Sequence, residues 1–416
     1  MASSSIGLSE LTRSSNQVVI RLLEGKKTSN DFDTFRANLL INNEQLMKDF
    51  LDKYILNADG SYKVMVKSKT FPDRSEYDGQ LVSDKRQGKG IVHYRNGEKY
   101  FGDWKNDLID GHGTHLYPNG EIYVGEFSYG KRHGKGKYVF FNGNTYEGEW
   151  REGKKHGKGV YYFFGTDETY TGEFQNGERD GNGHFKYAFG DVYEGAWRNN
   201  KRHGLGKLTY ANGDSYTGDW VEDYASGRGV MVHKNGERFE GHFLKGKKNG
   251  LGKSTYSSSE YYDGDYRDDQ KNGTGKYHFE SGDEYHGDWK NDMRSGKGIY
   301  YFANGDIYEG DWMNDRMSGN GTLVNTKKDK YIGEFVDGQM HGEGIMQYAN
   351  GDNYRGMWNR GTKHGQGTYH WTSGEVLNGI WTRDKIEGKC SLQCDKDEYI
   401  CTFEQGKMVK KEHLRK

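Results

Sequence analysis

Glycine and lysine lie close together at many places in this 416-residue chain, and loops that cradle phosphate are built from these two residue types. The nearest match to such a loop is GKKNGLGKST, residues 246–255. Gly252, the glycine before Lys253, follows Gly246 by six positions, whereas a P-loop requires five. No pattern of a strand followed by a helix surrounds the segment. The sequence therefore predicts a turn at this place and not a nucleotide site.

Five histidines recur at the same place in the chain's repeats, each just before a glycine, and histidine is a common metal ligand. They are His133, His156, His203, His341 and His364. His133 and His156 are one repeat of the chain apart, which corresponds to about 10 Å in a sheet of stacked hairpins. Zinc ligands lie about 2 Å from the metal, so one ion cannot bind both. We therefore predict that these histidines are turn residues and that there is no metal site.

Other catalytic signals are absent from the sequence. No Ser/His/Asp set, no pocket of paired carboxylates and no kinase signature is recognisable. The 60 basic and 61 acidic residues give a formal net charge of -1, which argues against a globally basic nucleic-acid binder. No apolar run approaches the length of a membrane span, and three cysteines without a signal-like start favour a reducing compartment. We expect a protein that is not an enzyme and has no cofactor.

A five-residue motif, Tyr-x-Gly-x-aromatic, recurs with a period of 23 residues and includes one step of 24 residues. It reads YFGDW, YVGEF, YEGEW, YTGEF, YEGAW, YTGDW, FEGHF, YDGDY, YHGDW, YEGDW, YIGEF and YRGMW from Tyr100 to Trp358. The weaker copies YDGQL at Tyr77 and LNGIW at Leu377 bring the number of units to fourteen. Periods of this length indicate a repeat architecture.

Each unit has the pattern of a two-stranded hairpin. In Tyr146, Gly148 and Trp150 alternate residues share one face of a strand. Residues 151–159 are rich in glycine and predict a turn, after which a second strand runs back. The pair Asn142-Gly143 then predicts a type I′ turn, and the glycines leave room for flat-lying aromatic rings. Because one hairpin is not stable alone, the units must stack into an elongated, single-layer, twisted antiparallel meander.

This pattern of Tyr-x-Gly-x-Trp/Phe, Gly-x-Gly, an aromatic and Asn-Gly-Asp/Glu resembles the MORN repeat (membrane occupation and recognition nexus). The resemblance covers about residues 71–403. We therefore expect a MORN array over residues 61–403, a helical cap or docking region over residues 1–60 and a basic tail over residues 404–416. Cys390 and Cys401 replace glycines of the pattern, which predicts a degenerate terminal repeat and no redox or metal role.

Basic pairs follow the motif in the first eight repeats, where they predict one basic edge of the sheet that could bind an acidic partner or lipid. The pairs are Lys85-Arg86, Lys131-Arg132, Lys154-Lys155, Lys201-Arg202 and Lys247-Lys248. Acidic residues follow the other turns and predict an acidic opposite edge: Glu98, Glu121, Asp191, Asp214, Glu237, Asp283, Asp306 and Asp352. Solvated turns without any partner are an equally good interpretation of this pattern.

Later repeats replace the basic pairs by apolar residues, Met293, Met317, Met340 and Ile386. These residues predict an apolar docking edge near the open C-terminal end of the sheet. MORN proteins that pair through their C-terminal repeats point the same way, so we expect self-association or partner docking through about residues 285–403.

The first 60 residues follow a helical pattern instead. Leu46, Phe50 and Tyr54 have helical spacing, and two earlier helices are predicted over residues 11–23 and 32–39. Their apolar faces need a cover, which is either the first hairpins or another protein.

The resemblance implies two roles. The first is a non-catalytic scaffold for protein–protein assembly in a cytoskeletal structure, because long arrays without a catalytic domain resemble radial-spoke-head components of the ciliary axoneme. The alternative is a peripheral membrane adaptor that binds acidic phospholipid through the basic edge. Because the basic pairs stop halfway and the net charge is near zero, we favour the scaffold. We expect partners in a cytoskeletal or ciliary assembly, a location in cytoplasm, cytoskeleton or cilium, and no nucleic acid.

Overall fold

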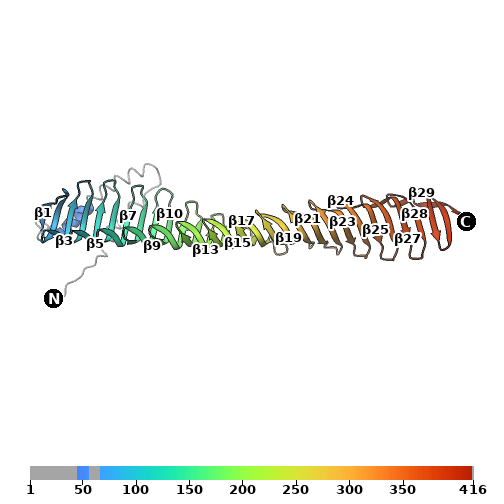
Figure 1. The fold of residues 1–416 in the computed structure, drawn as a ribbon, viewed down its shortest axis with the longest axis horizontal. Coiled ribbons are helices and arrows are strands. Elements are labelled where there is room, and N and C mark those ends of the chain that lie inside the picture. Colours follow the sequence, from blue (N-terminus) through green and yellow to red (C-terminus); the bar gives the residue numbers. More distant parts are fainter. Residues whose placement is uncertain (1–44, 56–65, 415–416) are drawn as a thin grey trace, which may run out of the picture. The chain divides into compact units, whose positions relative to one another are not determined.

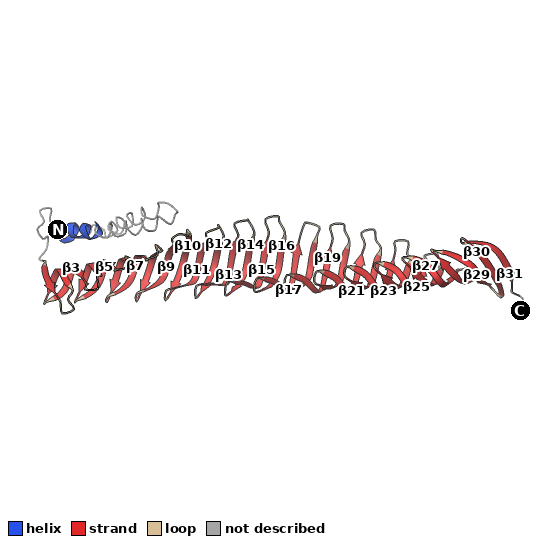
Figure 2. Cartoon of the chain, turned by 90° about the horizontal axis from the view of Figure 1, so that it is seen from above, coloured by secondary structure: helices blue, strands red, loops and turns tan. Residues whose placement is uncertain are grey.

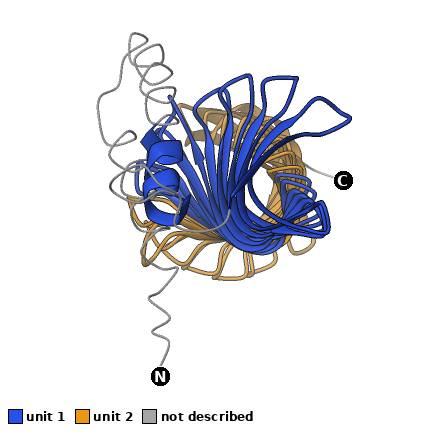
Figure 3. Ribbon diagram, turned by 90° about the vertical axis from the view of Figure 1, so that its left-hand side faces the viewer, with its two compact units in different colours: residues 1–223 blue, residues 224–416 orange. Residues whose placement is uncertain are grey.

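The computed structural model describes residues 45–55 and 66–414 of the chain (Figure 1). The chain divides into two compact units, residues 1–223 and residues 224–416, which Figure 3 shows in different colours. Both units are built almost entirely of antiparallel strands, as Figure 2 shows. The predicted mainly β class is confirmed.

The first unit is a meander in which each strand pairs with the next one along the chain. Its strands are β1 (Lys67–Thr70), β2 (Glu76–Val82), β3 (Lys85–His93), β4 (Lys99–Lys105), β5 (Leu108–Leu116), β6 (Ile122–Ser128), β7 (Lys131–Val139), β8 (Thr145–Arg151), β9 (Lys154–Phe163), β10 (Glu168–Gln175), β11 (Glu178–Lys186), β12 (Val192–Arg198), β13 (Lys201–Thr209) and β14 (Ser215–Val221).

The second unit repeats this pairing scheme. Its strands are β15 (Tyr224–Val232), β16 (Arg238–Leu244), β17 (Lys247–Thr255), β18 (Tyr261–Arg267), β19 (Gln270–His278), β20 (Glu284–Lys290), β21 (Met293–Tyr301), β22 (Ile307–Met313), β23 (Arg316–Val324), β24 (Lys330–Val336), β25 (Gln339–Gln347), β26 (Asn353–Asn359), β27 (Thr362–His370), β28 (Val376–Thr382), β29 (Lys385–Cys394), β30 (Asp397–Glu404) and β31 (Lys407–His413).

The two kinds of turn are the reverse of those predicted. Between β12 and β13 only Asn199 and Asn200 remain unpaired, and both have positive φ (49° and 68°), as a type I′ turn requires. The pair Asn142-Gly143 has positive φ at the glycine alone (84°). There the N–H of Gly143 donates to the carbonyl of Phe140 (2.9 Å), which closes a three-residue loop. The Asn142 side chain caps that loop by accepting the N–H of Asn144 (3.1 Å).

The prediction of one long turn over residues 151–159 is therefore wrong. Their turn is only Glu152-Gly153, both with positive φ, and β9 begins at Lys154. The register of the β8–β9 pair shifts between Gly148 and Glu149, where Gly157 of β9 takes a φ of +58°. A glycine bulge thus accounts for the local glycine content without breaking the strand.

One face of each sheet, the aromatic face, carries the first and fifth residues of the motif, such as Tyr146 and Trp150. Tyr146 is fully buried, and its ring lies over Gly148 and Gly159, which are paired across β8 and β9. A Cβ built on either glycine would lie 2.5–2.6 Å from the Tyr146 hydroxyl oxygen. The predicted role of the glycines is confirmed.

Consecutive repeats are joined by a ladder of edge-to-face rings on this aromatic face. The centroid of the Tyr146 ring lies 5.2 Å from that of Trp150 in its own repeat and 4.9 Å from that of Phe174 in the next. Such pairs contribute about 0.5–1.5 kcal/mol beyond the area that they bury. The Trp150 indole N–H also donates to the carbonyl of Gly136 in the preceding repeat (3.1 Å). A single layer can therefore bury a core because each repeat covers its neighbours.

The other face, the variable face, carries the second and fourth residues of the motif, such as Glu147 and Glu149. At its beginning a helical segment, residues 45–50 continued by η1 (Leu51–Ile55), lies against this face (Figures 2 and 3). Its buried side chains Leu46, Phe50 and Ile55 pack on a patch of β3–β7: Ile91, Phe101, Leu116, Ile122 and Val139. The helix predicted around Leu46–Ile55 is confirmed. The helices predicted over residues 11–23 and 32–39 lie outside the described residues.

The second unit extends past the predicted end of the array. Residues 407–413 lie in the predicted basic tail, but they form β31 and pair with β30. Met408 lies opposite Phe403 across this pair, as Met317 lies opposite Trp312 in β22 and β23. The C-terminal segment thus follows the repeat pattern once more, and all seven residues of β31 are exposed.

Candidate functional site

The first members of the predicted basic pairs lie at the turn edge and are exposed, but acidic neighbours accompany them. Lys131 Nζ lies 2.7 Å from Glu152, and Lys201 Nζ lies 2.5 Å from Glu222, each in the turn of the next repeat. Lys247 Nζ lies 3.7 Å from Asp268 in the same way. Lys85 and Lys154 hold the equivalent exposed positions. The edge therefore carries interleaved charges of both signs.

The second members of the pairs do not lie on this edge, because they turn toward the aromatic face. They are Arg86, Arg132, Lys155, Arg202 and Lys248. The guanidinium carbon of Arg132 lies 4.5 Å from the centroid of the Trp150 ring, and Arg132 Nη2 donates to the carbonyl of Gly153 (2.9 Å). Arg202 lies 4.3 Å from the Trp220 ring and pairs with Asp223 (3.2 Å).

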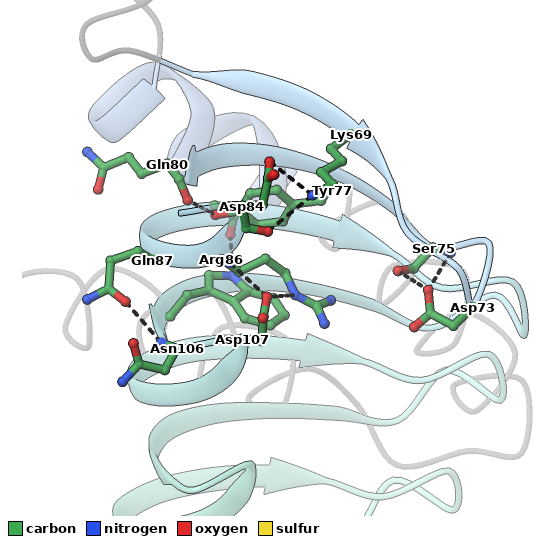
Figure 4. A network of polar contacts seen from close by, with 12 residues as sticks. Lys69, Asp73, Ser75, Tyr77, Gln80, Asp84, Arg86, Gln87, Asn106 and Asp107 are labelled. Atoms are coloured by element: carbon green, nitrogen blue, oxygen red, sulfur yellow. Dashed lines mark hydrogen bonds and ion pairs between the residues drawn. The ribbon is translucent and has the colours of Figure 1, made fainter. Parts of the chain in front are cut away.

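Arg86 shows the same arrangement in the first repeats, as Figure 4 shows. Its guanidinium lies 4.6 Å from the Trp104 ring, and its Nε lies 3.5 Å from Asp107. Asp107 also accepts the backbone N–H of Arg86 (2.8 Å). Arg86 and Arg202, each stacked on a ring and paired with a carboxylate of the next turn, thus tie that type I′ turn to the preceding repeat, which is a structural role.

Two lysines at the second strand position show that burial against the aromatic rings lowers the pKa of the ammonium group. Lys155 lies over the rings of Tyr161 (4.5 Å) and Phe174 (5.2 Å). Desolvation, followed by the nearby Arg179 charge, lowers the pKa of Lys155 to about 8. Desolvation also lowers the pKa of Lys248, although Asp269 opposes the shift. Burial on the aromatic face therefore penalises the charged form of a lysine.

The acidic residues after the other turns also have structural partners. The Glu121 carboxylate accepts the hydroxyl of Tyr138 (2.8 Å) and the backbone N–H of Phe141 (3.1 Å) in the next repeat. Desolvation raises the pKa of Glu121, but these bonds and one from Asn119 lower it more, and the net shift is downward. The fourth motif residue, Glu149, accepts the N–H of Lys158 next to the bulge (3.1 Å).

The predicted apolar docking residues also divide between the exposed turn edge and the aromatic face. Met293 occupies the first position of β21 and is exposed. Met317 and Met340 occupy the second position, where they lie opposite Trp312 and Phe335 and are half-buried. Ile386 is buried opposite Trp381. Three of the four residues therefore substitute for the stacked cation, and Met293 alone of the four lies at the edge.

The remaining predicted groups hold no common site within residues 45–55 and 66–414. No set of three or more His, Cys, Asp or Glu side chains gathers there in a way that could hold a metal ion. Nδ1 of both His133 and His203 is buried without a hydrogen-bond partner. Cys390 and Cys401 are buried and face each other across β29 and β30. Within these ranges no helix combines the length and apolar character needed to cross a membrane.

The variable face was missed by the sequence analysis, although it differs most between repeats. Second motif residues on this face include Phe101, Val124, Glu147, Thr171, Glu194, Glu309 and Ile332. In the second unit a shallow groove of about 830 Å³ lies along β21–β24, lined on this face by Lys297, Ile299, Glu309, Asn320, Thr322 and Ile332. Reading every second motif position as one row would have revealed this variation, since alternate residues of a strand share a face.

The solved structures to which the chain is similar are remote. The TCP domain of SAS-4 from Drosophila melanogaster, in complex with a proline-rich motif of Ana2, is 13% identical over 46% of this chain and 84% of that chain, with a TM-score of 0.22. The TCP10 domain of CPAP from Danio rerio, in complex with a STIL peptide, is 11% identical over 65% of this chain and 93% of that one, with a TM-score of 0.19. Similarities of this size carry no argument about function.

No curated protein matches the chain. The family model of the MORN repeat, in contrast, matches thirteen consecutive segments. They begin with residues 77–99 and end with residues 354–376. The fourteenth predicted unit, which begins at Leu377, lies beyond these matches, and there leucine replaces the motif tyrosine and Cys390 a glycine. Because the matched repeats cover most of the sequence and coincide with the observed hairpins, the chain belongs to the MORN-repeat family.

Proposed function

We propose that this protein is a non-catalytic scaffold that mediates protein–protein assembly in a cytoskeletal structure. The observation that carries the proposal is the distribution of its chemical groups. The cations, carboxylates and tyrosines of the repeat are engaged in contacts between hairpins, as for Arg132 and Glu121. What differs from repeat to repeat is the variable face, which offers a series of dissimilar surfaces along one array.

Within this role, the finer proposal is a place in the ciliary axoneme, in an assembly similar to the radial-spoke head. It rests on the family resemblance of long MORN arrays that lack a catalytic domain. A tagged protein expressed in ciliated cells, followed by cross-linked pull-down and mass spectrometry, tests it. We expect signal along the axoneme and recovery of axonemal proteins. A tagged protein spread evenly through the cell, with no cytoskeletal protein enriched over an untagged control, would contradict the scaffold role.

Self-association through the C-terminal repeats is part of the same proposal. β31 has a neighbour on one side in its unit, β30, and all its residues are exposed, so a strand of another molecule can add to its other edge. We expect light scattering to show a dimer at tens of micromolar. Removal of residues 407–416 exposes a different edge, so the sharper variant is Met408→Pro. Met408 holds the second strand position, where the backbone N–H points away from the preceding strand, as that of Arg86 points to Asp107. A full-length chain that stays monomeric contradicts self-association.

The alternative function is a peripheral adaptor for acidic phospholipid. The observation in its favour is the row of exposed lysines at the turn edge: Lys85, Lys131, Lys154, Lys201 and Lys247. Their acidic neighbours reduce the net attraction of this edge, and we therefore place the scaffold first. Binding to vesicles of defined composition distinguishes the two functions.

A further inference from the structure

The helical segment on the first unit shows what the variable face can bind. Tyr54 lies over Lys89, whose Nζ is 4.9 Å from the centroid of the ring. Lys89 also pairs with Asp103 of β4 (2.6 Å). The ring of Phe50 lies 5.4 Å from that of Phe101. Beneath the segment the cluster includes apolar residues of β3, β5 and β6, namely Ile91, Leu116 and Val124.

The same positions recur in β21–β24 of the second unit. Ile299 follows Gly-Lys-Gly as Ile91 does, Val324 ends its strand as Leu116 does, and Ile332 is a second motif residue like Val124. The ion pair recurs as well, between Lys297 and Asp311 (2.5 Å). We call this set, Lys297, Ile299, Asp311, Val324 and Ile332, the second helix seat.

Among the described residues nothing covers the second helix seat. The Lys297 side chain is 75% exposed, whereas that of Lys89 beneath the helical segment is 27% exposed. Ile332 is 38% exposed, and the neighbouring Tyr301 and Ile307 are 36% and 39% exposed. These residues adjoin the groove of about 830 Å³ along β21–β24, so the apolar surface is both open and hollowed.

We infer that the second helix seat binds an amphipathic helix of a partner protein, whose apolar stripe includes an aromatic residue placed over Lys297. The chain's own helical segment on the first unit is the model for this partner helix. That segment presents Leu46, Phe50 and Tyr54 at intervals of four residues. This inference rests on the proposed scaffold function and names the chemistry of one partner.

One difference between the seats gives the partner helix its own specificity. Glu309 stands where the first unit has Phe101, the contact of Phe50. Glu309 is exposed, so it favours a basic residue of the partner at the position equivalent to Phe50. The groove along β9–β12 is a poorer seat, because its variable face is lined mainly by polar residues such as Thr171, His184 and Glu194.

The test uses the full-length protein and an acetylated, fluorescent peptide of residues 45–55, QLMKDFLDKYI, as the stand-in helix. We expect binding with a dissociation constant below about 1 mM and slower hydrogen exchange in residues 297–332. Glu309→Phe copies the first seat and should tighten binding about tenfold, which corresponds to ~1.4 kcal/mol. The Phe50→Lys peptide should prefer the unaltered protein over this variant.

Matched substitutions distinguish binding at the second helix seat from non-specific hydrophobic binding elsewhere on the sheet. Ile299→Glu and Ile332→Glu should each weaken binding at least about tenfold. Val160→Glu is the control, since Val160 also follows Gly-Lys-Gly and is 40% exposed. Lys297→Ala should weaken the unaltered peptide severalfold and leave a Tyr54→Ala peptide unchanged, because the two changes remove one contact.

Three results would overturn the inference: no binding up to about 1 mM peptide, equal loss with Val160→Glu, or protection confined to residues 91–124, which would mean exchange with the chain's own helix. A failure of this test leaves the scaffold function to its own measurement. Ciliary or cytoskeletal partners that are still recovered with Ile332→Glu would place their docking elsewhere on the array.

Discussion

The two faces of the sheet differ in how much each repeat is allowed to vary. On the aromatic face the same tyrosine, glycine pair and stacked ring recur, and a tyrosine such as Tyr146 or Tyr308 is fully buried. On the variable face the second motif residue changes from Phe101 to Glu147 to Thr171. Contacts between repeats therefore constrain one face, while the other can be adapted to partners without disturbing the stack.

The strongest test of this comparison introduces the same side chain on each face of one strand. Gly148→Val should cost about 3 kcal/mol or more, at the upper end of overpacking, because a Cβ there would lie 2.5 Å from the Gly159 Cα. Glu147→Val on the variable face should lower the free energy of unfolding by only about 1 kcal/mol, through loss of its ion pair with Lys137 (3.2 Å). Chemical denaturation measures both values.

Hydrogen exchange locates the damage caused by Gly148→Val. Since each hairpin contacts its neighbours, protection should fall around residues 123–174 and persist in distant repeats. Uniform loss of protection over the whole array would contradict the picture of independent, stacked units.

The second test removes part of the cover on the variable face. Leu46→Ala should weaken the packing of residues 45–55 on β3–β7 by about 2 kcal/mol, since Leu46 is 9% exposed. The sheet itself should remain folded by circular dichroism, while exchange rises near Ile91 and Leu116. Lys48→Ala on the exposed side is the control. Loss of the β signal with Leu46→Ala would mean that the helix is an integral cap of the sheet.

Much of the fold could be predicted because the same local residue pattern recurs in every repeat. The alternation of Tyr146, Gly148 and Trp150 identifies a strand and its buried face without any long-range information. The glycine content of residues 151–159 misleads, because it favours a turn locally, while pairing with β8 extends the segment as a strand around the bulge at Gly157. Once these residues form a strand, alternation places Lys155 with Gly159 on the aromatic face.

The place where the helical segment packs on the sheet could not be predicted from local sequence. Helical spacing predicts Leu46 and Phe50 as one apolar stripe, but it does not indicate which sheet face receives them. That choice depends on residues of β3–β7 that lie many positions away, such as Phe101 and Val139. The second helix seat was missed for the same reason, since its members become neighbours only when four strands are aligned.

The third test concerns the stacked cation on the aromatic face. Lys155→Met should raise stability by about 1 kcal/mol at pH 7, since a half-buried ammonium is replaced by the residue that β23 and β25 use at this position. Lys154→Met, on the exposed neighbour, should have little effect. A loss of stability with Lys155→Met would mean that the rings of Tyr161 and Phe174 stabilise the cation more than desolvation penalises it.

The pH dependence of Lys155 gives the same test a second measurement. Its folded pKa is about 8, below the value of about 10.4 for an unfolded chain. Between these values the unfolded state binds more protons, so stability rises with pH from about 8 to 10.4. Lys155→Met should remove that rise. Thermal unfolding of both proteins at several pH values in this window measures the difference.

The smallest effects are expected at the turn edge, where the lysines face solvent. Lys131→Glu and Lys154→Glu together should change stability by less than about 1 kcal/mol, because exposed ion pairs contribute little. Arg132 and Lys155 are left intact in this variant, since reversing their charge would disturb the aromatic face.

Vesicles with acidic phospholipid should bind the unaltered protein weakly, with up to about 1 kcal/mol per lysine that reaches the surface. The binding should be weak because opposite charges such as Glu152 lie beside Lys131, and it should decline with salt because dissolved ions screen the exposed lysines. Tight, headgroup-specific binding at physiological salt, abolished by the two substitutions, would instead make the turn edge a membrane site and move the functional weight from the variable face to this edge.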